Sequence, residues 1–230
     1  MLEKKLAGMK AAEYIRDNMI LGLGTGSTAF YLIRQVGELV KYGLKIRAVP
    51  TSQSTADLAR ESNIPLASID EVDHIDLAID GVDEIDSSFN AVKGGGGALL
   101  REKIVASIAR EVIWIMDSGK LVDSIGAFPL PVEILPYGCR HVMNHMKSLS
   151  LNPVLRLQDG APFVTDNQNY ILDLHIGKGF NIEQISDMLL SIPGVIETGL
   201  FPNMCDRVIV GTGSVVKIIE NTNKPRRTSG

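Results

Sequence analysis

The chain has 230 residues, of which 45% are hydrophobic and 22% are charged, a composition typical of a globular protein and not of a disordered one. Its 23 basic and 27 acidic side chains leave a net charge of −4, which argues against a nucleic-acid partner held through phosphates. The N-terminus has no apolar signal core, and no segment reaches the roughly 18 uncharged apolar residues of a membrane span. Two cysteines, Cys139 and Cys205, are too few for a disulfide framework, which indicates a reducing compartment. Together with the missing signal core and membrane span, this predicts a cytoplasmic protein with no membrane partner.

Helix-like and strand-like segments alternate over the first half of the chain. The spacing of apolar residues predicts helices within residues 2–19, 28–40, 52–61 and 98–110. Short apolar runs predict strands at residues 20–23, 45–49, 75–79 and 112–116. Apolar strands that alternate with helices of about ten residues indicate crossover units, in a sheet covered on both faces. The expected fold class is therefore α/β, with an open, mostly parallel sheet flanked by helices (Rossmann-like).

A different order of elements begins near residue 130. The pattern predicts a strand, a helix, two strands, a helix and a strand, at residues 132–135, 140–149, 154–157, 170–176, 182–191 and 195–201. This βαββαβ order predicts a smaller ferredoxin-like α+β domain. Residues 208–210 are expected to return to the first sheet. We therefore expect a catalytic α/β domain at residues 1–129 and 206–230, a smaller domain at 130–205, and a frayed polar tail after residue 220.

Three unusual loops each follow a predicted strand of the first domain, where the ligand crevice of an open parallel sheet lies. The first is the run Gly22-Leu23-Gly24-Thr25-Gly26-Ser27-Thr28, which opens a helix. Its glycines allow backbone N–H groups to approach an anion, and the helix N-terminus adds a favourable dipole, so a phosphate is the expected ligand. No Gly-Lys-Ser/Thr follows, and Ser27 replaces the third glycine of a dinucleotide fingerprint. An ordinary strand-to-helix turn capped by Ser or Thr is the alternative.

The second loop is acidic and runs Asp80-Gly81-Val82-Asp83-Glu84-Ile85-Asp86. Three interpretations are open: a solvated acidic loop, a divalent metal site, and acid–base chemistry on hydroxyl groups. The spacing of the oxygen ligands excludes an EF-hand. Two carboxylates three residues apart on a tight loop can face one small ligand.

The third loop is the run Lys93-Gly94-Gly95-Gly96-Gly97, which precedes the helix that carries Glu102. Four consecutive glycines cost folding entropy and are reasonable where a backbone must approach a ligand closely. On a helical wheel Glu102, in the second turn of the predicted helix, lies on the side of Ala98, Ala106 and Ala109, which predicts partial burial. The alternative is a surface glutamate paired with a neighbouring Arg101 or Lys103.

Other candidate residues carry weaker signals. His141 and His145 have the i, i+4 spacing of zinc ligands, but Val142 stands where a zinc protease has its glutamate, so a structural helix is favoured over a metal site. The run Asp117-Ser118-Gly119-Lys120 follows another apolar strand, and Lys120 is placed to reach the same crevice.

The motifs GLGTGSTA, DGVDEID and KGGGGALLREKIVA, in this order and spacing, resemble the A-type ribose-5-phosphate isomerase family. The segments DSGK, FPLPVEILP, VTDNQNYILD, IPGVIETGLF and VIVGTG are also similar to that family, so the resemblance covers essentially the whole chain. It implies interconversion of ribose 5-phosphate and ribulose 5-phosphate through an enediolate, in the non-oxidative pentose phosphate pathway. It further implies no metal, no cofactor, a small-molecule sugar phosphate as ligand, and a homodimer or homotetramer.

The resemblance also implies roles for residues that match the family's motifs. Glu102 is implied as the general base and Lys93 as the group that stabilises the oxyanion. Asp80 and Asp83 are implied to hold sugar hydroxyls, with Asp80 assisting ring opening. The implied substrate-binding residues, besides Asp80, Asp83 and Lys93, are Thr25, Gly26, Ser27, Thr28, Gly81, Val82, Gly94, Gly95, Gly96, Lys120 and Lys4, with Lys5 as the alternative to Lys4. Gly97 stands where the family often has alanine, and we expect this difference only to loosen the helix start.

Two other functions are open from the sequence. An aminosugar-phosphate deaminase would share the fold and a phosphate loop. A regulatory domain that senses a sugar phosphate would bind it without turnover, but the chain leaves only about twenty residues before the phosphate loop and has no basic patch for DNA. Turnover of ribose 5-phosphate distinguishes all three.

Overall fold

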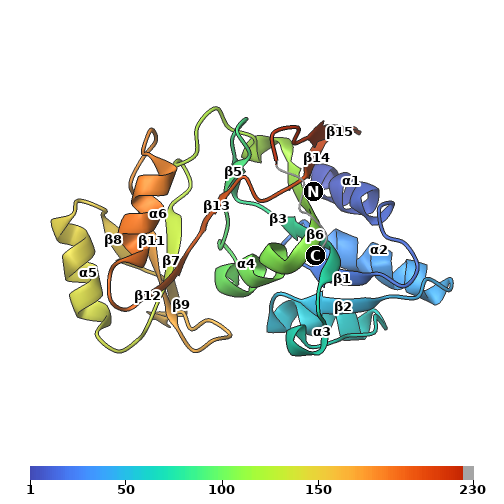
Figure 1. The fold of residues 1–230 in the computed structure, drawn as a ribbon, viewed down its shortest axis with the longest axis horizontal. Helices are drawn as coiled ribbons and strands as arrows, with labels where there is room; N and C mark the ends of the chain where they lie inside the picture. The colour runs from blue at the N-terminus through green and yellow to red at the C-terminus, as the bar shows by residue number, and fades with distance from the viewer. Residues whose placement is uncertain (225–230) are drawn as a thin grey trace. The chain divides into compact units, whose positions relative to one another are not determined.

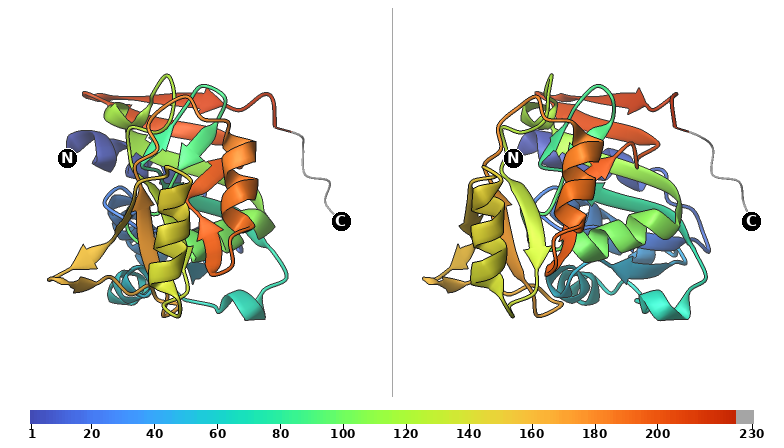
Figure 2. Two further views of the ribbon diagram at one scale, coloured as in Figure 1. Left: turned by 90° about the vertical axis from the view of Figure 1, so that its left-hand side faces the viewer. Right: turned by 60° about the vertical axis from the view of Figure 1, so that its left-hand side comes forward.

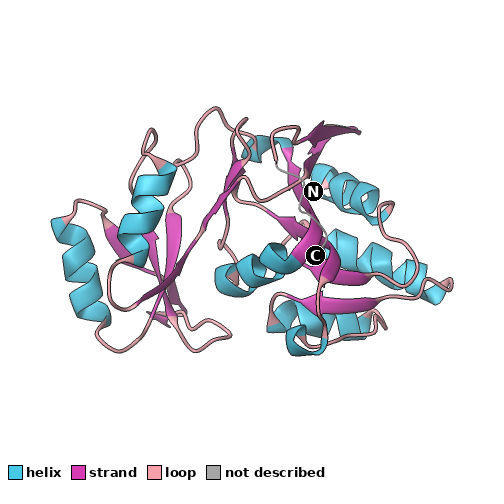
Figure 3. Cartoon of the chain, in the orientation of Figure 1, coloured by secondary structure: helices cyan, strands magenta, loops and turns pink. Residues whose placement is uncertain are grey.

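The structure is a computed structural model, and it describes residues 1–224. Residues 225–230 of the predicted polar tail lie outside the described residues. The chain forms two compact units: unit 1 contains Met1–Val82, Arg101–Leu121 and the chain from Asn203 onward, and unit 2 contains Asp83–Leu100 and Val122–Pro202. Unit 2 thus includes residues 83–100, which the sequence-based division assigns to the catalytic domain. The sequence-based division into a catalytic and a smaller domain stays a proposal. Both units contain helices and strands (Figure 3).

Unit 1 is built on a six-stranded sheet in the order β15-β14-β6-β3-β1-β2 (Figure 1). All neighbouring strands are parallel except β14 and β15, which form an antiparallel edge pair. The elements of this unit are α1 (Leu2–Ala12), β1 (Ile20–Leu23), α2 (Ala29–Lys41), β2 (Arg47–Pro50), α3 (Gln53–Glu61), η1 (Ile69–Glu71), β3 (Ile75–Gly81), α4 (Leu99–Ile108, whose first two residues belong to unit 2), β6 (Ala109–Asp117), η2 (Ser118–Lys120), β14 (Arg207–Thr212) and β15 (Val215–Glu220). The predicted α/β class is confirmed, and β14 returns to this sheet as expected.

Helices cover both faces of this sheet. Leu21 and Leu23 of β1 belong to one apolar cluster with side chains of α1, α2 and α3. Gly22 lies between them and faces the opposite side, because successive residues of a strand alternate. A Cβ at Gly22 would lie 2.6 Å from Val105 of α4. The glycine therefore allows α4, the helix that carries Glu102, to pack closely on the second face.

Unit 2 contains an antiparallel four-stranded sheet in the order β12-β7-β11-β8, the strand order of a ferredoxin-like fold. Helices α5 and α6 lie on the same face of this sheet (Figure 2, yellow and orange), where they share an apolar cluster with β7 and β11. The elements are β7 (Leu130–Ile134), α5 (Cys139–Ser148), β8 (Pro153–Leu155), β9 (Leu157–Gln158), β10 (Ala161–Pro162), β11 (Tyr170–Leu174), α6 (Ile182–Leu190) and β12 (Val195–Thr198).

The strand expected over residues 195–201 is two strands, and this part of the prediction is wrong. After β12, Gly199 interrupts the chain, and β13 (Leu200–Pro202) joins a separate sheet with β5 (Asn90–Val92) and β4 (Glu84–Ile85). A Cβ at Gly199 would lie 2.3 Å from the carbonyl oxygen of Lys93, so this close approach requires glycine. The sequence did not predict this small sheet, and its strand β5 ends directly before Lys93.

Among residues 1–224, no helix combines the length and the apolar character that crossing a bilayer requires.

Candidate active site

The loop between β1 and α2 presents polar groups at a helix N-terminus. Gly26 and Ser27 are exposed, and Thr28 is the buried N-cap residue of α2. The Lys4 ammonium donates to Ser27 Oγ at 2.9 Å and lies 3.8 Å from the Asp117 carboxylate, whereas the side chain of Lys5 is exposed. The structure thus places Lys4, and not Lys5, at the loop. A lysine, exposed loop residues and a helix dipole together form a favourable environment for an anion.

The Thr25 hydroxyl belongs to a cluster of side-chain hydroxyls that the sequence did not reveal. Thr25 Oγ1 lies 2.8 Å from Thr51 Oγ1, 2.8 Å from Ser52 Oγ and 3.0 Å from Thr55 Oγ1. Thr55 also donates to the Gly24 carbonyl at 2.9 Å, so the start of α3 supports the loop. These bonds hold the loop in one conformation before any ligand binds.

Asp80 lies against the same loop at the end of β3. Its Oδ1 accepts the Thr25 N–H at 3.0 Å and the Gly81 N–H at 2.7 Å, and the side chain is buried. A Cβ at Gly24 would lie 2.0 Å from Asp80 Oδ1. Gly24 is therefore the residue that allows the carboxylate and the loop to pack together, within unit 1.

We expect Gly24→Ala to lower kcat/KM by about 100-fold, because the new methyl group must displace the Asp80 carboxylate by an ångström or more. Gly37→Ala is the matched control, since its Cβ would lie 2.7 Å from Ser62 Cβ, away from the loop. Steady-state kinetics and thermal unfolding of both variants provide the comparison. A loss of kcat/KM in Gly24→Ala no larger than in Gly37→Ala would contradict this role of Gly24.

The four carboxylates of the acidic segment have different surroundings. Glu84 is buried and accepts the N–H groups of Gly126 at 2.7 Å and Phe128 at 2.9 Å. Asp86 accepts N–H groups of Ser88 and Asn90. Glu84 and Asp86 therefore hold backbone in place, and the acidic segment is not a uniformly solvated loop.

In residues 1–224, no group of three or more His, Cys, Asp and Glu side chains is arranged to hold a metal ion, and His141 and His145 belong to no such group.

Asp83 contacts the glycine-rich loop within unit 2. Its Oδ2 accepts the Gly95 N–H at 2.8 Å. Gly94 has a φ of +101°, in the left-handed region that favours glycine. The Lys93 N–H donates to the Gly199 carbonyl at 2.9 Å, which ties the start of the loop to the segment before β13.

Lys93 is a buried lysine, with 1% of its surface exposed. Its Nζ lies 5.4 Å from the ring centroid of Phe201 on β13. Lysine is rarely buried to this extent, because removal of an ammonium group from water is costly. Burial of Lys93 thus indicates a function for its charge, and Phe201 is a neighbour that sequence analysis missed.

The structure corrects two expectations, one for Gly97 and one for the helix that follows it. Gly97 has a φ of +80°, and a Cβ at this position would lie 2.4 Å from the ring of Phe163. The glycine therefore serves a left-handed backbone and close packing, and does not merely loosen the helix start. Because α4 begins at Leu99, Glu102 lies in its first turn and not in its second.

Glu102 is buried, with 5% of its surface exposed, and this confirms the burial that its position on the helical wheel predicted. Glu102 is therefore not an exposed surface residue. Lys120 was predicted to reach the crevice, and its Nζ donates to the Val82 carbonyl at the end of the Asp80–Val82 segment. Unit 1 thus brings together the β1–α2 loop, Lys4, the Asp80–Val82 segment and Lys120, and unit 2 brings together Asp83 and the loop that follows Lys93.

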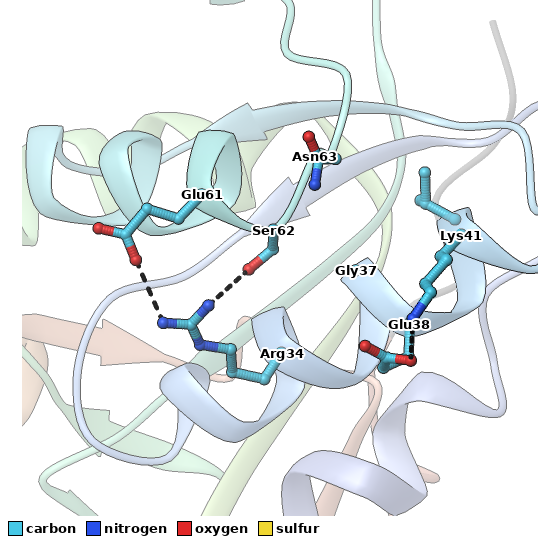
Figure 4. A pocket seen from close by; sticks show the side chains of 8 residues that line it. Arg34, Gly37, Glu38, Lys41, Glu61, Ser62 and Asn63 are labelled. Atoms are coloured by element: carbon cyan, nitrogen blue, oxygen red, sulfur yellow. Dashed lines mark hydrogen bonds and ion pairs between the residues drawn. The ribbon is translucent and has the colours of Figure 1, made fainter.

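A separate pocket in unit 1 contains none of the predicted site residues. It lies between α2 and the end of α3 (Figure 4). Arg34 donates to Glu61 at 3.1 Å and Lys41 lies 3.8 Å from Glu38, so both cations are paired with carboxylates. This pocket is a poor site for an anionic ligand.

A mostly parallel α/β sheet with a glycine- and hydroxyl-rich loop at a helix N-terminus is typical of the class of enzymes that act on small phosphorylated metabolites. The family model for ribose 5-phosphate isomerase A (phosphoriboisomerase A) matches residues 47–214. Ribose-5-phosphate isomerase A of Streptococcus pneumoniae serotype 19F (strain G54) is 49% identical over 216 residues, which cover 94% of this chain and 95% of the relative. The chain belongs to the ribose-5-phosphate isomerase A family.

Solved structures agree with this assignment. A D-ribose-5-phosphate isomerase in complex with phospho-erythronic acid has a TM-score of 0.91 and 40% identity, and the match covers 95% of this chain and 97% of that one. Ribose 5-phosphate isomerase A from Methanocaldococcus jannaschii has a TM-score of 0.90 and 36% identity, over 95% and 98% of the two chains. The chain is thus a ribose-5-phosphate isomerase of the pentose phosphate pathway. The resemblance seen in the sequence is confirmed, and a deaminase or a non-catalytic sensor is set aside.

Proposed function

We propose that Glu102 is the general base of the isomerisation, and its burial in the first turn of α4 is the observation that carries this proposal. Glu102 takes the proton from C2 of open-chain ribose 5-phosphate, and the electron pair moves to the aldehyde oxygen, which gives an enediolate. The proton returns to C1, while the hydroxyl proton of O2 is lost and O1 gains one. The product is ribulose 5-phosphate, and no net oxidation occurs.

Lys93 stabilises the negative charge that develops on the enediolate oxygen. A buried ammonium group is effective in this role, because a charge that is preoriented in a site of low polarity does not have to reorganise during the reaction. Its burial beside Phe201 supports this assignment. The mechanism requires no metal and no organic cofactor.

The loop from Thr25 to Thr28 and Lys4 bind the phosphate, with Lys120 adding positive charge. Asp80 and Asp83 hold the sugar hydroxyls, and Asp80 assists the opening of the furanose ring. Backbone groups of Gly81, Val82, Gly94, Gly95 and Gly96 complete the substrate contacts. The bonds from Thr25 and Gly81 to Asp80, and from Gly95 to Asp83, support these roles because they fix the orientation of both carboxylates. Binding energy from the remote phosphate then serves to orient the reacting carbons.

A sugar phosphate is thus the ligand of this chain, as phospho-erythronic acid is of the structurally similar isomerase. We also infer that the protein acts in the cytoplasm as a homodimer or homotetramer, as the resemblance to the family implies. The net charge of −4 supports the absence of a nucleic-acid partner.

The test of this function is formation of ribulose 5-phosphate by protein treated with a chelator. We expect full activity with ribose 5-phosphate, and kcat/KM about 10³-fold lower with ribose, since several charge-assisted hydrogen bonds to phosphate are lost. Inorganic phosphate is expected to compete with the substrate. Activity that is lost on chelation and restored by Mg²⁺ or Zn²⁺ would reverse the metal-free mechanism. Equal turnover of ribose and ribose 5-phosphate would exclude the phosphate site.

A further inference from the structure

Arg156 lies between β8 and β9 of unit 2, and its guanidinium group is held in one orientation. Its side chain is 15% exposed and pairs with Asp173 of β11. Nε donates to Asp173 Oδ2 at 2.9 Å, and Nη2 donates to Asp173 Oδ1. Two parallel bonds to one carboxylate fix the plane of the guanidinium group, which lysine cannot reproduce.

The remaining nitrogen of this group contacts the glycine-rich loop. Arg156 Nη1 donates to the carbonyl oxygens of Gly94 at 2.8 Å and Gly95 at 3.1 Å. In a trans peptide the C=O and the following N–H point in opposite directions. With both carbonyls directed at Arg156, the N–H groups of Gly95 and Gly96 point to the other side of the loop. The Gly95 N–H meets Asp83 there, at 2.8 Å.

This loop needs an external support, because glycine residues have access to many backbone conformations. The aromatic ring of Phe163 supplies a second contact. Phe163 fills the space that a Cβ at Gly97 would need, and its ring centroid lies 5.9 Å from the Arg156 guanidinium carbon. Arg156, Phe163 and Asp83 therefore constrain the loop that directly follows Lys93.

We propose that Arg156 is a positioning residue for the isomerisation, which holds the Gly94 and Gly95 peptides so that the Gly95 N–H stays on Asp83 and the Gly96 N–H, on the same side of the loop, faces the substrate. The inference rests on the proposed role of Lys93 and the glycine loop. Arg156 itself acts through the two carbonyls, and its loss leaves the phosphate-binding residues of unit 1 intact. The effect is therefore expected mainly in kcat, with a smaller change in KM.

Arg156→Lys is the informative variant, because lysine keeps the positive charge but cannot bind Asp173 through two nitrogens and the two carbonyls through a third. We expect kcat to fall about 10–100-fold, with KM changed less than about threefold. Arg207→Lys is the matched control: Arg207 belongs to unit 1, is 21% exposed, pairs with Glu111 at 2.7 Å and lies 4.5 Å from the ring of Tyr14. It is expected to keep kcat within about twofold of the unsubstituted enzyme.

A second measurement reports directly on the loop. The Gly97 N–H donates to the Gly94 carbonyl at 3.0 Å, the same oxygen that Arg156 holds. Hydrogen exchange of this amide, followed by NMR, is expected to accelerate about tenfold in Arg156→Lys and to stay unchanged in Arg207→Lys. If Arg156→Lys fails to fold, Asp173→Asn provides the test, since it keeps the guanidinium group and weakens only its anchor; a smaller fall in kcat is then expected.

A kcat in Arg156→Lys equal to that of Arg207→Lys, or unchanged kcat and exchange in Asp173→Asn, would overturn the inference. Lys93→Met, measured in parallel, separates this result from failure of the proposed function. An inactive Lys93→Met beside a fully active Arg156→Lys removes only the positioning role. A fully active Lys93→Met removes the proposed role of Lys93, on which the inference rests.

Discussion

Substitution of Glu102 by glutamine is expected to lower kcat by about 10²–10⁴-fold and to leave KM nearly unchanged. Glutamine keeps the shape of the side chain and its capacity to form hydrogen bonds, but it has no basic oxygen to accept the proton from C2. Because the phosphate loop and the sugar-binding carboxylates are untouched, substrate affinity is preserved. The measurements are kcat and KM for ribose 5-phosphate, together with exchange of solvent protons at the substrate carbon.

Glu133→Gln is the control that shows the effect of substituting a buried glutamate with no proposed role in the reaction. Glu133 is fully buried on β7 of unit 2, where Oε1 accepts hydrogen bonds from Thr165, Asn167 and Asn169. Its substitution is expected to change stability but to leave kcat within a few-fold of the unsubstituted enzyme. If Glu102→Gln behaves in the same way, Glu102 is only a structural residue of α4, and the base must be sought among Asp80, Asp83 and Glu84.

Lys93→Met is expected to lower kcat by about 10²–10³-fold, the cost of removing one group that stabilises a developing oxyanion. Methionine preserves much of the length of the side chain and its contact with Phe201, so it removes the charge with little change in packing. The measurement is kcat with saturating ribose 5-phosphate, alongside circular dichroism to establish that the variant is folded.

Another buried lysine supplies the control for this experiment. The side chain of Lys224 is 6% exposed and pairs with Asp206 at 2.8 Å in unit 1. Lys224→Met is expected to lose stability, because it leaves the Asp206 carboxylate without its cation, and to retain kcat. Equal kcat values for Lys93→Met and Lys224→Met would mean that the charge of Lys93 has no part in the reaction.

Local patterns in the sequence predicted most of the elements. The strand at residues 20–23 and the start of α6 at residue 182 coincide with the structure, because buried strands and amphipathic helices have characteristic spacing of apolar residues. The short strands β4, β5 and β13 were missed or misassigned. Each contains two or three residues, and β13 pairs with β5 from a distant part of the chain, so no local period reveals them. The edge strand β15 was also missed, since most of its side chains are exposed.

The sequence by itself determined the family and the reaction of this protein and supplied the candidate residues for it. The run of glycine and hydroxyl residues before a helix, the acidic segment, the lysine before four glycines and the glutamate on the alanine side of a helix were all recognisable, because each depends on residue types close together in the chain. Their combination was sufficient to indicate the family, and the comparisons confirm it.

Only the tertiary structure decided which contacts are made by neighbouring residues of similar type. Glu84 holds backbone N–H groups, whereas Asp80 lies against Gly24 at the β1–α2 loop. Lys4 reaches Ser27 and Lys5 does not, because only one of two successive side chains on α1 faces the loop. Arg156 contacts Gly94 and Gly95, which lie 62 and 61 residues earlier in the chain, and no motif marks it. These contacts are set by packing between segments distant in the chain, and a one-dimensional pattern contains no record of such distances.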